Sequence, residues 1–137
     1  MKTYPYLRAY MAGITVPTLF LLVLVSLLTA GHGHPPSLSF ERFAFFPMAV
    51  VPNAWGAWNA LRLAVRPGWR LPLGWHGALL AVLLPLAGAG LAVAAGLELP
   101  DLTIAAVAAG WPAVVAVYFL AWKYLVGFLN ELLGVHA

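Results

Sequence analysis

Four long apolar segments, separated by short polar links, constrain this 137-residue chain more than any other feature of its sequence. A helix that crosses a bilayer needs about 20 mostly apolar residues, because about 30 Å of hydrocarbon is covered at 1.5 Å per residue. The segments that meet this requirement are 9–30, 43–61, 73–97 and 102–122. Their apolar residues are continuous, whereas barrel strands would alternate apolar with polar residues. We therefore predict an all-α membrane protein with four transmembrane helices.

The composition agrees with this prediction. Apolar residues make up 64% of the chain and charged residues only 8%, whereas a soluble domain carries about 25% charged residues. Seven basic and four acidic side chains are too few to coat a soluble globule, and too few for a nucleic-acid binder. The sequence has no cysteine, which excludes a disulfide scaffold and a cysteine-based metal or redox site. We expect residues 1–137 to form a single membrane domain.

The links between the segments are short, so consecutive helices are expected to be antiparallel neighbours in a four-helix bundle. Basic residues near the helix ends set the orientation, because they favour the cytoplasmic side. Six of the seven fall on one side of a four-span chain: Lys2, Arg8, Arg62, Arg66, Arg70 and Lys123. This predicts a multi-pass protein of the cell inner (plasma) membrane with both termini in the cytoplasm. The tail, 124–137, is predicted to lie along the cytoplasmic membrane surface.

The N-terminus allows a second interpretation. Lys2 and Arg8, the following apolar stretch and the sequence Leu28-Thr29-Ala30 are also compatible with a secretory signal cleaved near Ala30. The stretch is longer than the usual signal core of 7–15 residues, which favours a span that is kept. Cleavage would leave three spans.

Prolines and small residues predict how the helices are shaped and packed. Each predicted span has a proline near its centre, which removes a backbone hydrogen bond and predicts a bent helix; these are Pro17, Pro52, Pro85 and Pro112. Small residues recur every four positions in the last two spans, at Gly88, Ala92 and Gly96 and at Ala105, Ala109 and Ala113. Such stripes let helices approach closely in lipid. They predict either tight packing within one subunit or a seam between two copies.

The most informative stretch is Pro52–Asn59 in the second span, where Asn53 lies near the predicted midplane. An amide there must find a partner or it costs several kcal/mol. One hypothesis is a solute site, and the other is a structural hydrogen bond to a backbone carbonyl freed by a proline. The residues assigned to this polar site are Asn53, Trp55, Asn59, Thr18 and Trp111.

Other chemistry is sparse in the sequence. No acidic residue falls inside a predicted span, which argues against a carboxylate-driven exporter. The pair His32 and His34 offers two metal ligands where three or four are needed, and His76 has no second histidine at matching depth for a haem. We expect no metal and no cofactor. A basic cluster of Arg62, Arg66, Arg70 and Lys123 is expected to face the lipid headgroups.

These features predict a non-enzymatic protein whose surroundings are the lipid bilayer. It is expected to be a small subunit or scaffold that associates through its helix faces, either with itself or with a larger membrane complex. The alternative is a transporter or channel for a small neutral or apolar solute, built around Asn53.

Overall fold

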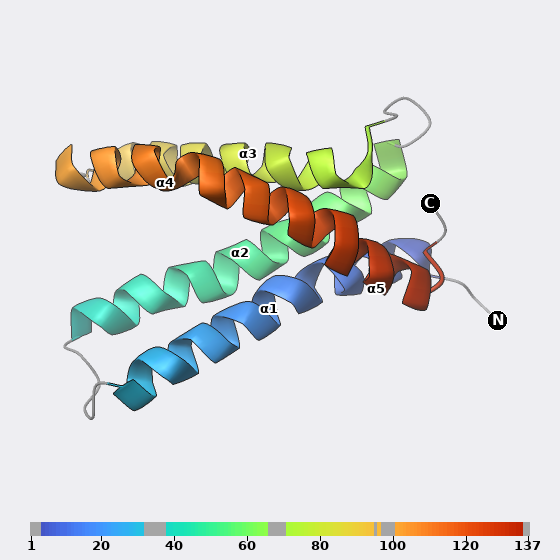
Figure 1. Ribbon diagram of the computed structural model, residues 1–137, viewed down its shortest axis with the longest axis horizontal. Coiled ribbons are helices and arrows are strands. Elements are labelled where there is room, and N and C mark those ends of the chain that lie inside the picture. Colours follow the sequence, from blue (N-terminus) through green and yellow to red (C-terminus); the bar gives the residue numbers. More distant parts are fainter. Residues whose placement is uncertain (1–3, 32–37, 66–70, 95, 97–100, 136–137) are drawn as a thin grey trace. The chain divides into compact units, whose positions relative to one another are not determined.

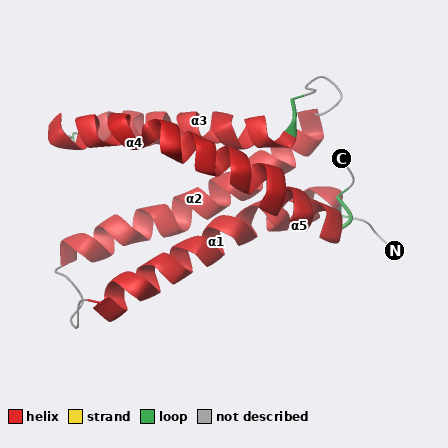
Figure 2. Ribbon diagram, viewed as in Figure 1, coloured by secondary structure: helices red, strands yellow, loops and turns green. Residues whose placement is uncertain are grey.

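The computed structural model describes residues 4–31, 38–65, 71–94, 96 and 101–135. Every element within these ranges is helical (Figure 2). The elements are α1 (Pro5–Gly31), α2 (Leu38–Val65), α3 (Leu73–Ala94), α4 (Asp101–Leu120), the π-helix η1 (Ala121–Val126) and α5 (Gly127–Leu132). The all-α prediction is therefore confirmed for the described part of the chain.

Within the described residues, three helical segments are long and apolar enough to cross a membrane, which indicates a membrane protein. They are Pro5–Leu27, Leu73–Gly90 and Ala108–Leu132. The predicted second span, 43–61, lies within α2, which has 28 residues but is not among these three. The count of four spans and the cytoplasmic position of both termini remain predictions.

The last of these segments continues beyond the predicted end of the fourth span at residue 122. It passes from α4 through η1 into α5, so the first part of the predicted tail is helical as far as Leu132. The reason is that the stretch 123–135 is mostly apolar, with Lys123, Asn130 and Glu131 as its only strongly polar residues. That this tail lies along the membrane surface remains a prediction.

The chain divides into two compact units. Unit 1 contains Met1–Trp69 and Phe128–Ala137, and unit 2 contains Arg70–Gly127. In unit 1, α1 and α2 form an antiparallel pair, and α5 belongs to the same unit although it comes from the other end of the chain (Figure 1). In unit 2, α3 and α4 form a second antiparallel pair.

Glycines set the packing of α1 on α2. A Cβ atom on Gly13 would lie 2.5 Å from the carbonyl oxygen of Trp55 and 2.9 Å from the Cα of Gly56. A Cβ atom on Gly56 would lie 2.8 Å from the ring of Tyr10. The two backbones therefore approach more closely than any larger side chain would allow, as is typical of helices that associate in lipid.

Glycines also set the packing of α3 on α4 and η1 within unit 2. A Cβ atom on Gly74 would lie 2.7 Å from the ring of Phe119, and one on Gly77 would lie 2.5 Å from Trp122. Trp122 is fully buried. Phe119 also meets Trp75 edge to face, with 5.5 Å between the ring centroids, a favourable aromatic geometry.

Three helices continue through an internal proline. Pro17 lies inside α1, Pro85 inside α3 and Pro112 inside α4. Pro52 lies within the bounds of α2 and is buried. The predicted positions of the prolines within helices are thus confirmed, and the bends at them remain predictions.

Candidate functional site

The most completely buried polar cluster in the described residues is centred on Asn59, in unit 1. The Asn59 side chain is 0% exposed. Its Nδ2 donates to the carbonyl oxygen of Ala9 at 2.7 Å and to Oδ1 of Asn130 at 2.9 Å. Its Oδ1 accepts from Nε of Arg62 at 3.2 Å and from Nδ2 of Asn130 at 3.4 Å. One amide thus joins α1, α2 and α5.

The helical spacing explains how this cluster forms. Asn59 and Arg62 are three residues apart on α2, so their side chains lie on one face of that helix. An asparagine amide offers two N–H donors and an oxygen with two lone pairs, and at Asn59 all four of these positions have partners. Because an unsatisfied buried amide is costly in an apolar surrounding, the complete set of hydrogen bonds makes this burial possible.

Arg62 and Asn130 are buried alongside Asn59, with exposed fractions of 8% and 3%. Arg62 therefore places its guanidinium next to an amide oxygen and not at an exposed surface. The cluster consists of two amides, a guanidinium and a backbone carbonyl, none of which gains or loses protons near neutral pH. These groups can bind and position other groups, but they are not suited to acid–base or nucleophilic chemistry.

The end of α5 is fixed next to the same cluster. Nη1 of Arg8 donates to the carbonyl oxygen of Leu133 at 3.3 Å. Gly134 has a φ of +66°, its N–H donates to Glu131, and the N–H of Val135 donates to Asn130. These two hydrogen bonds and the left-handed glycine make a Schellman C-cap. Arg8 thus adds a positive charge at a helix C-terminus, where it is favourable.

Asn53 lies apart from this cluster. Its side chain is exposed, and its Oδ1 accepts a hydrogen bond from the Tyr10 hydroxyl of α1. One partner of this amide is thus a side chain of the neighbouring helix, and the hydrogen bond to a freed backbone carbonyl remains a prediction.

The other residues assigned to the polar site fall in different places. Trp55 is buried on α2, in unit 1 with Asn53 and Asn59. Thr18 is exposed, and its hydroxyl donates to the Ile14 carbonyl of its own helix at 2.7 Å. Trp111 is half-buried and belongs to unit 2.

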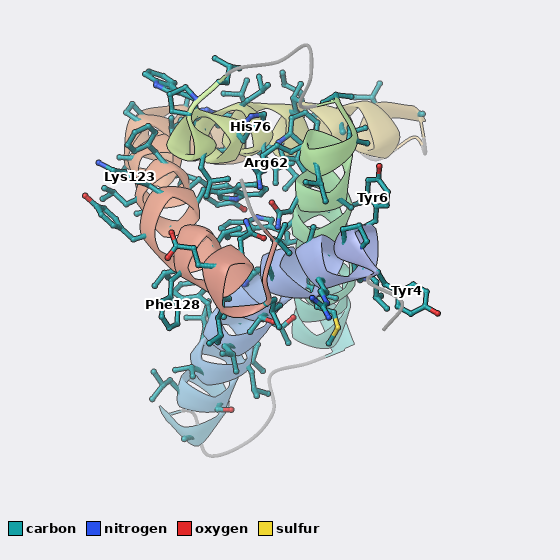
Figure 3. All side chains as sticks on the ribbon, turned by 90° about the vertical axis from the view of Figure 1, so that its right-hand side faces the viewer. Tyr4, Tyr6, Arg62, His76, Lys123 and Phe128 are labelled. Carbon is teal, nitrogen blue, oxygen red and sulfur yellow. The ribbon has the colours of Figure 1, made fainter. Side chains whose placement is uncertain are left out.

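The predicted basic cluster is described at only two of its four positions. Arg62 is buried in the Asn59 cluster, whereas Lys123 is exposed and points outward from η1 in unit 2 (Figure 3). Nζ of Lys123 lies 5.0 Å from the ring centroid of Tyr124, within cation–π range. Arg66 and Arg70 lie outside the described residues.

Metal-ligand residues do not gather in the described ranges. No group of three or more His, Cys, Asp or Glu side chains there could hold a metal ion. His32 and His34 lie outside these ranges. His76 is buried in α3 with an exposed fraction of 1%.

The sequence alone does not reveal how Asn130 and Arg8 hold α5. It places Asn130 in the predicted tail and Arg8 near the start of the first span, and neither position predicts a contact with the other end of the chain. The available signal was an amide within the apolar tail, which needs a partner if the tail is buried. That the partner is Asn59, 71 positions earlier in the chain, depends on the tertiary fold.

Comparisons with protein-family models, with curated proteins and with solved structures found no match to this chain.

Proposed function

We propose that this protein is a small, non-enzymatic integral membrane subunit that associates with a second copy of itself through α4. The observation that carries the proposal is the exposure of the alanine stripe, which we define as Ala105, Ala109 and Ala113. All three side chains are exposed, and a Cβ atom added to the neighbouring Gly110 would meet nothing within 4 Å.

The packing inside unit 2 supports this use of the stripe. The contacts of α3 with α4 and η1 described above involve Gly74 and Gly77 against Phe119 and Trp122. Phe119 and Trp122 lie beyond the alanine stripe along the chain. Small residues in lipid allow another helix to approach closely. The exposed stripe therefore favours the seam between two copies over the alternative of packing within one subunit.

The chemistry of the buried cluster supports a structural role. Its groups hold helices together, and none of them is a nucleophile or a general base. We accordingly propose an inner-membrane protein with both termini in the cytoplasm, for which the bilayer and a second copy are the partners.

The test is the mass of the protein purified in mild detergent, with substitutions on α4. We expect the unaltered protein to be a dimer or larger, and Ala109→Leu to shift it to a monomer, because the larger side chain separates the helices. Ala108→Leu is the matched control: Ala108 is also exposed but lies about 100° around the helix from Ala109. A strictly monomeric native protein would contradict the proposal, as would an unchanged mass for Ala109→Leu.

A site for a small neutral solute at Asn53 is the second candidate. It is favoured by the pairing of the exposed Asn53 amide with the Tyr10 hydroxyl, which makes a polar spot on the apolar α1–α2 pair. If this candidate is correct, Asn53→Leu abolishes solute flux into liposomes and leaves the thermal unfolding temperature unchanged. If the amide is structural, the same change lowers that temperature.

A further inference from the structure

We propose that residues 128–135, which we name the C-terminal latch, dock reversibly on the α1–α2 pair and hold unit 2 at both of its ends. The chain leaves unit 1 after Trp69 and returns to it at Phe128. With the latch docked, unit 2 is tied to unit 1 through both of these points. With the latch detached, only the connection after Trp69 remains.

The latch is held by few contacts. Of its eight residues only Asn130 and Val135 are buried. Among its apolar side chains, Phe128 and Leu132 are 60% and 67% exposed, whereas Leu129 and Leu133 are half-buried. Apolar burial of the latch is therefore partial, and the hydrogen bonds of Asn130 and of the Leu133 carbonyl contribute to its docking alongside it.

The polar contacts also fix where the latch docks. The amide of Asn130 pairs with Asn59 in both directions, and the helix end meets Arg8 through Leu133. A buried amide pair specifies one register, because any shift breaks both hydrogen bonds between Asn59 and Asn130. The latch therefore has one docked position.

The π-helix η1 aligns the latch with the rest of its helix. In an α-helix, 3.6 residues make one turn. A residue four positions further along therefore lies about 40° further around the helix axis. The wider π-turn, with i→i+5 bonds such as that from Gly127 to Trp122, offsets this rotation. Trp122, Val126 and Asn130 recur at four-residue spacing and are each buried.

The experiment measures the distance between α1 and the latch in liposomes by spin labels. The chain has no cysteine, so labels can be placed at Met11→Cys on α1 and Glu131→Cys on the latch, both of which are exposed. We expect one narrow distance in the otherwise native protein. Asn130→Leu should add a longer distance and raise the ratio of detached to docked molecules about three- to tenfold, as measured for interhelical polar bonds in membranes.

A second label pair separates detachment from unfolding. Met11→Cys with Leu61→Cys reports the α1–α2 distance, and Asn130→Leu should leave that distance unchanged. Ala57→Leu, a change to leucine at an exposed position of α2, is the control and should alter neither distance. A latch distance that stays narrow in Asn130→Leu would overturn the proposal. So would an α1–α2 distance that broadens together with it, because α1 and α2 would then depend on the latch for their own packing.

Discussion

Gly13 and Trp55 mark the closest approach between α1 and α2. An alanine at position 13 would place its Cβ 2.5 Å from the Trp55 carbonyl oxygen, and a backbone atom cannot move aside as a flexible side chain can. We predict that Gly13→Ala destabilises the protein by about 1–3 kcal/mol, the usual cost of overpacking. The measurement is the thermal unfolding temperature in detergent, followed by circular dichroism.

Gly90→Ala is the control for this substitution. Gly90 lies on α3, and a Cβ atom there would meet nothing within 4 Å. Alanine is the better helix former by up to about 1 kcal/mol, so this variant should unfold at the same temperature or higher. Equal unfolding temperatures for Gly13→Ala and the native protein would show that the helices separate at little cost.

At the level of single residues, the sequence indicated which side chains need partners but not which partners they find. Asn59 was recognised as a polar residue in an apolar helix, but its contacts with Ala9 and Asn130 join segments far apart in the chain. Periodicity and composition describe one segment at a time and do not contain such pairings.

The C-cap of α5 depends on a backbone conformation that glycine adopts without strain. Gly134 has a φ of +66°, where any L side chain costs about 1–2 kcal/mol. We predict that Gly134→Ala loosens the turn that donates the Val135 N–H to Asn130. Hydrogen exchange at the Val135 amide should become about five- to thirtyfold faster, since 1–2 kcal/mol corresponds to that factor.

Gly96→Ala is the matched control at the end of α3. Gly96 has a φ of +70° and also closes a turn, with its N–H donating to Val93, but it belongs to unit 2. Its substitution should leave exchange at Val135 unchanged. If Gly134→Ala also has no effect there, the hydrogen bonds do not depend on the left-handed glycine.

At the level of elements, the apolar runs predicted the helices well and their ends less well. Segment 9–30 corresponds to α1, Pro5–Gly31, because nothing in its first turn opposes a helix and proline is favoured at a helix start. The structure extends the last helix through η1 to Leu132. A π-turn has no local signature of the kind that glycine or proline gives to a turn, so η1 could not be predicted from residues 121–126.

At the scale of the whole molecule, the hydrogen bond between Arg8 and the Leu133 carbonyl limits the number of membrane crossings between these two residues. An odd number of crossings between these residues would put them at opposite faces, about 30 Å apart. Three helical segments among the described residues are apolar enough to cross, and a hydrogen bond between the two ends requires an even number of crossings. We therefore predict that α2 crosses as the fourth span, in spite of its buried Asn59 and Arg62.

This prediction can be checked by labelling single cysteines with a membrane-impermeant thiol reagent on oriented vesicles. Tyr4→Cys and Glu131→Cys lie near the two ends, and both side chains are exposed. Both should react from the same side of the membrane. Reaction from opposite sides would require an odd number of crossings and would leave α2 outside the bilayer.

The contact between Asn59 and Asn130 has a consequence for biosynthesis. The two residues are 71 positions apart, and ribosomes add about 5–20 residues per second. Asn130 is therefore synthesised about 4–14 s after Asn59. Throughout that interval the nascent chain carries an amide and a guanidinium that α5 has not yet covered. In a stalled or truncated polypeptide, the Asn59 amide and the Arg62 guanidinium stay uncovered. These uncovered polar groups distinguish an incomplete chain from a complete one.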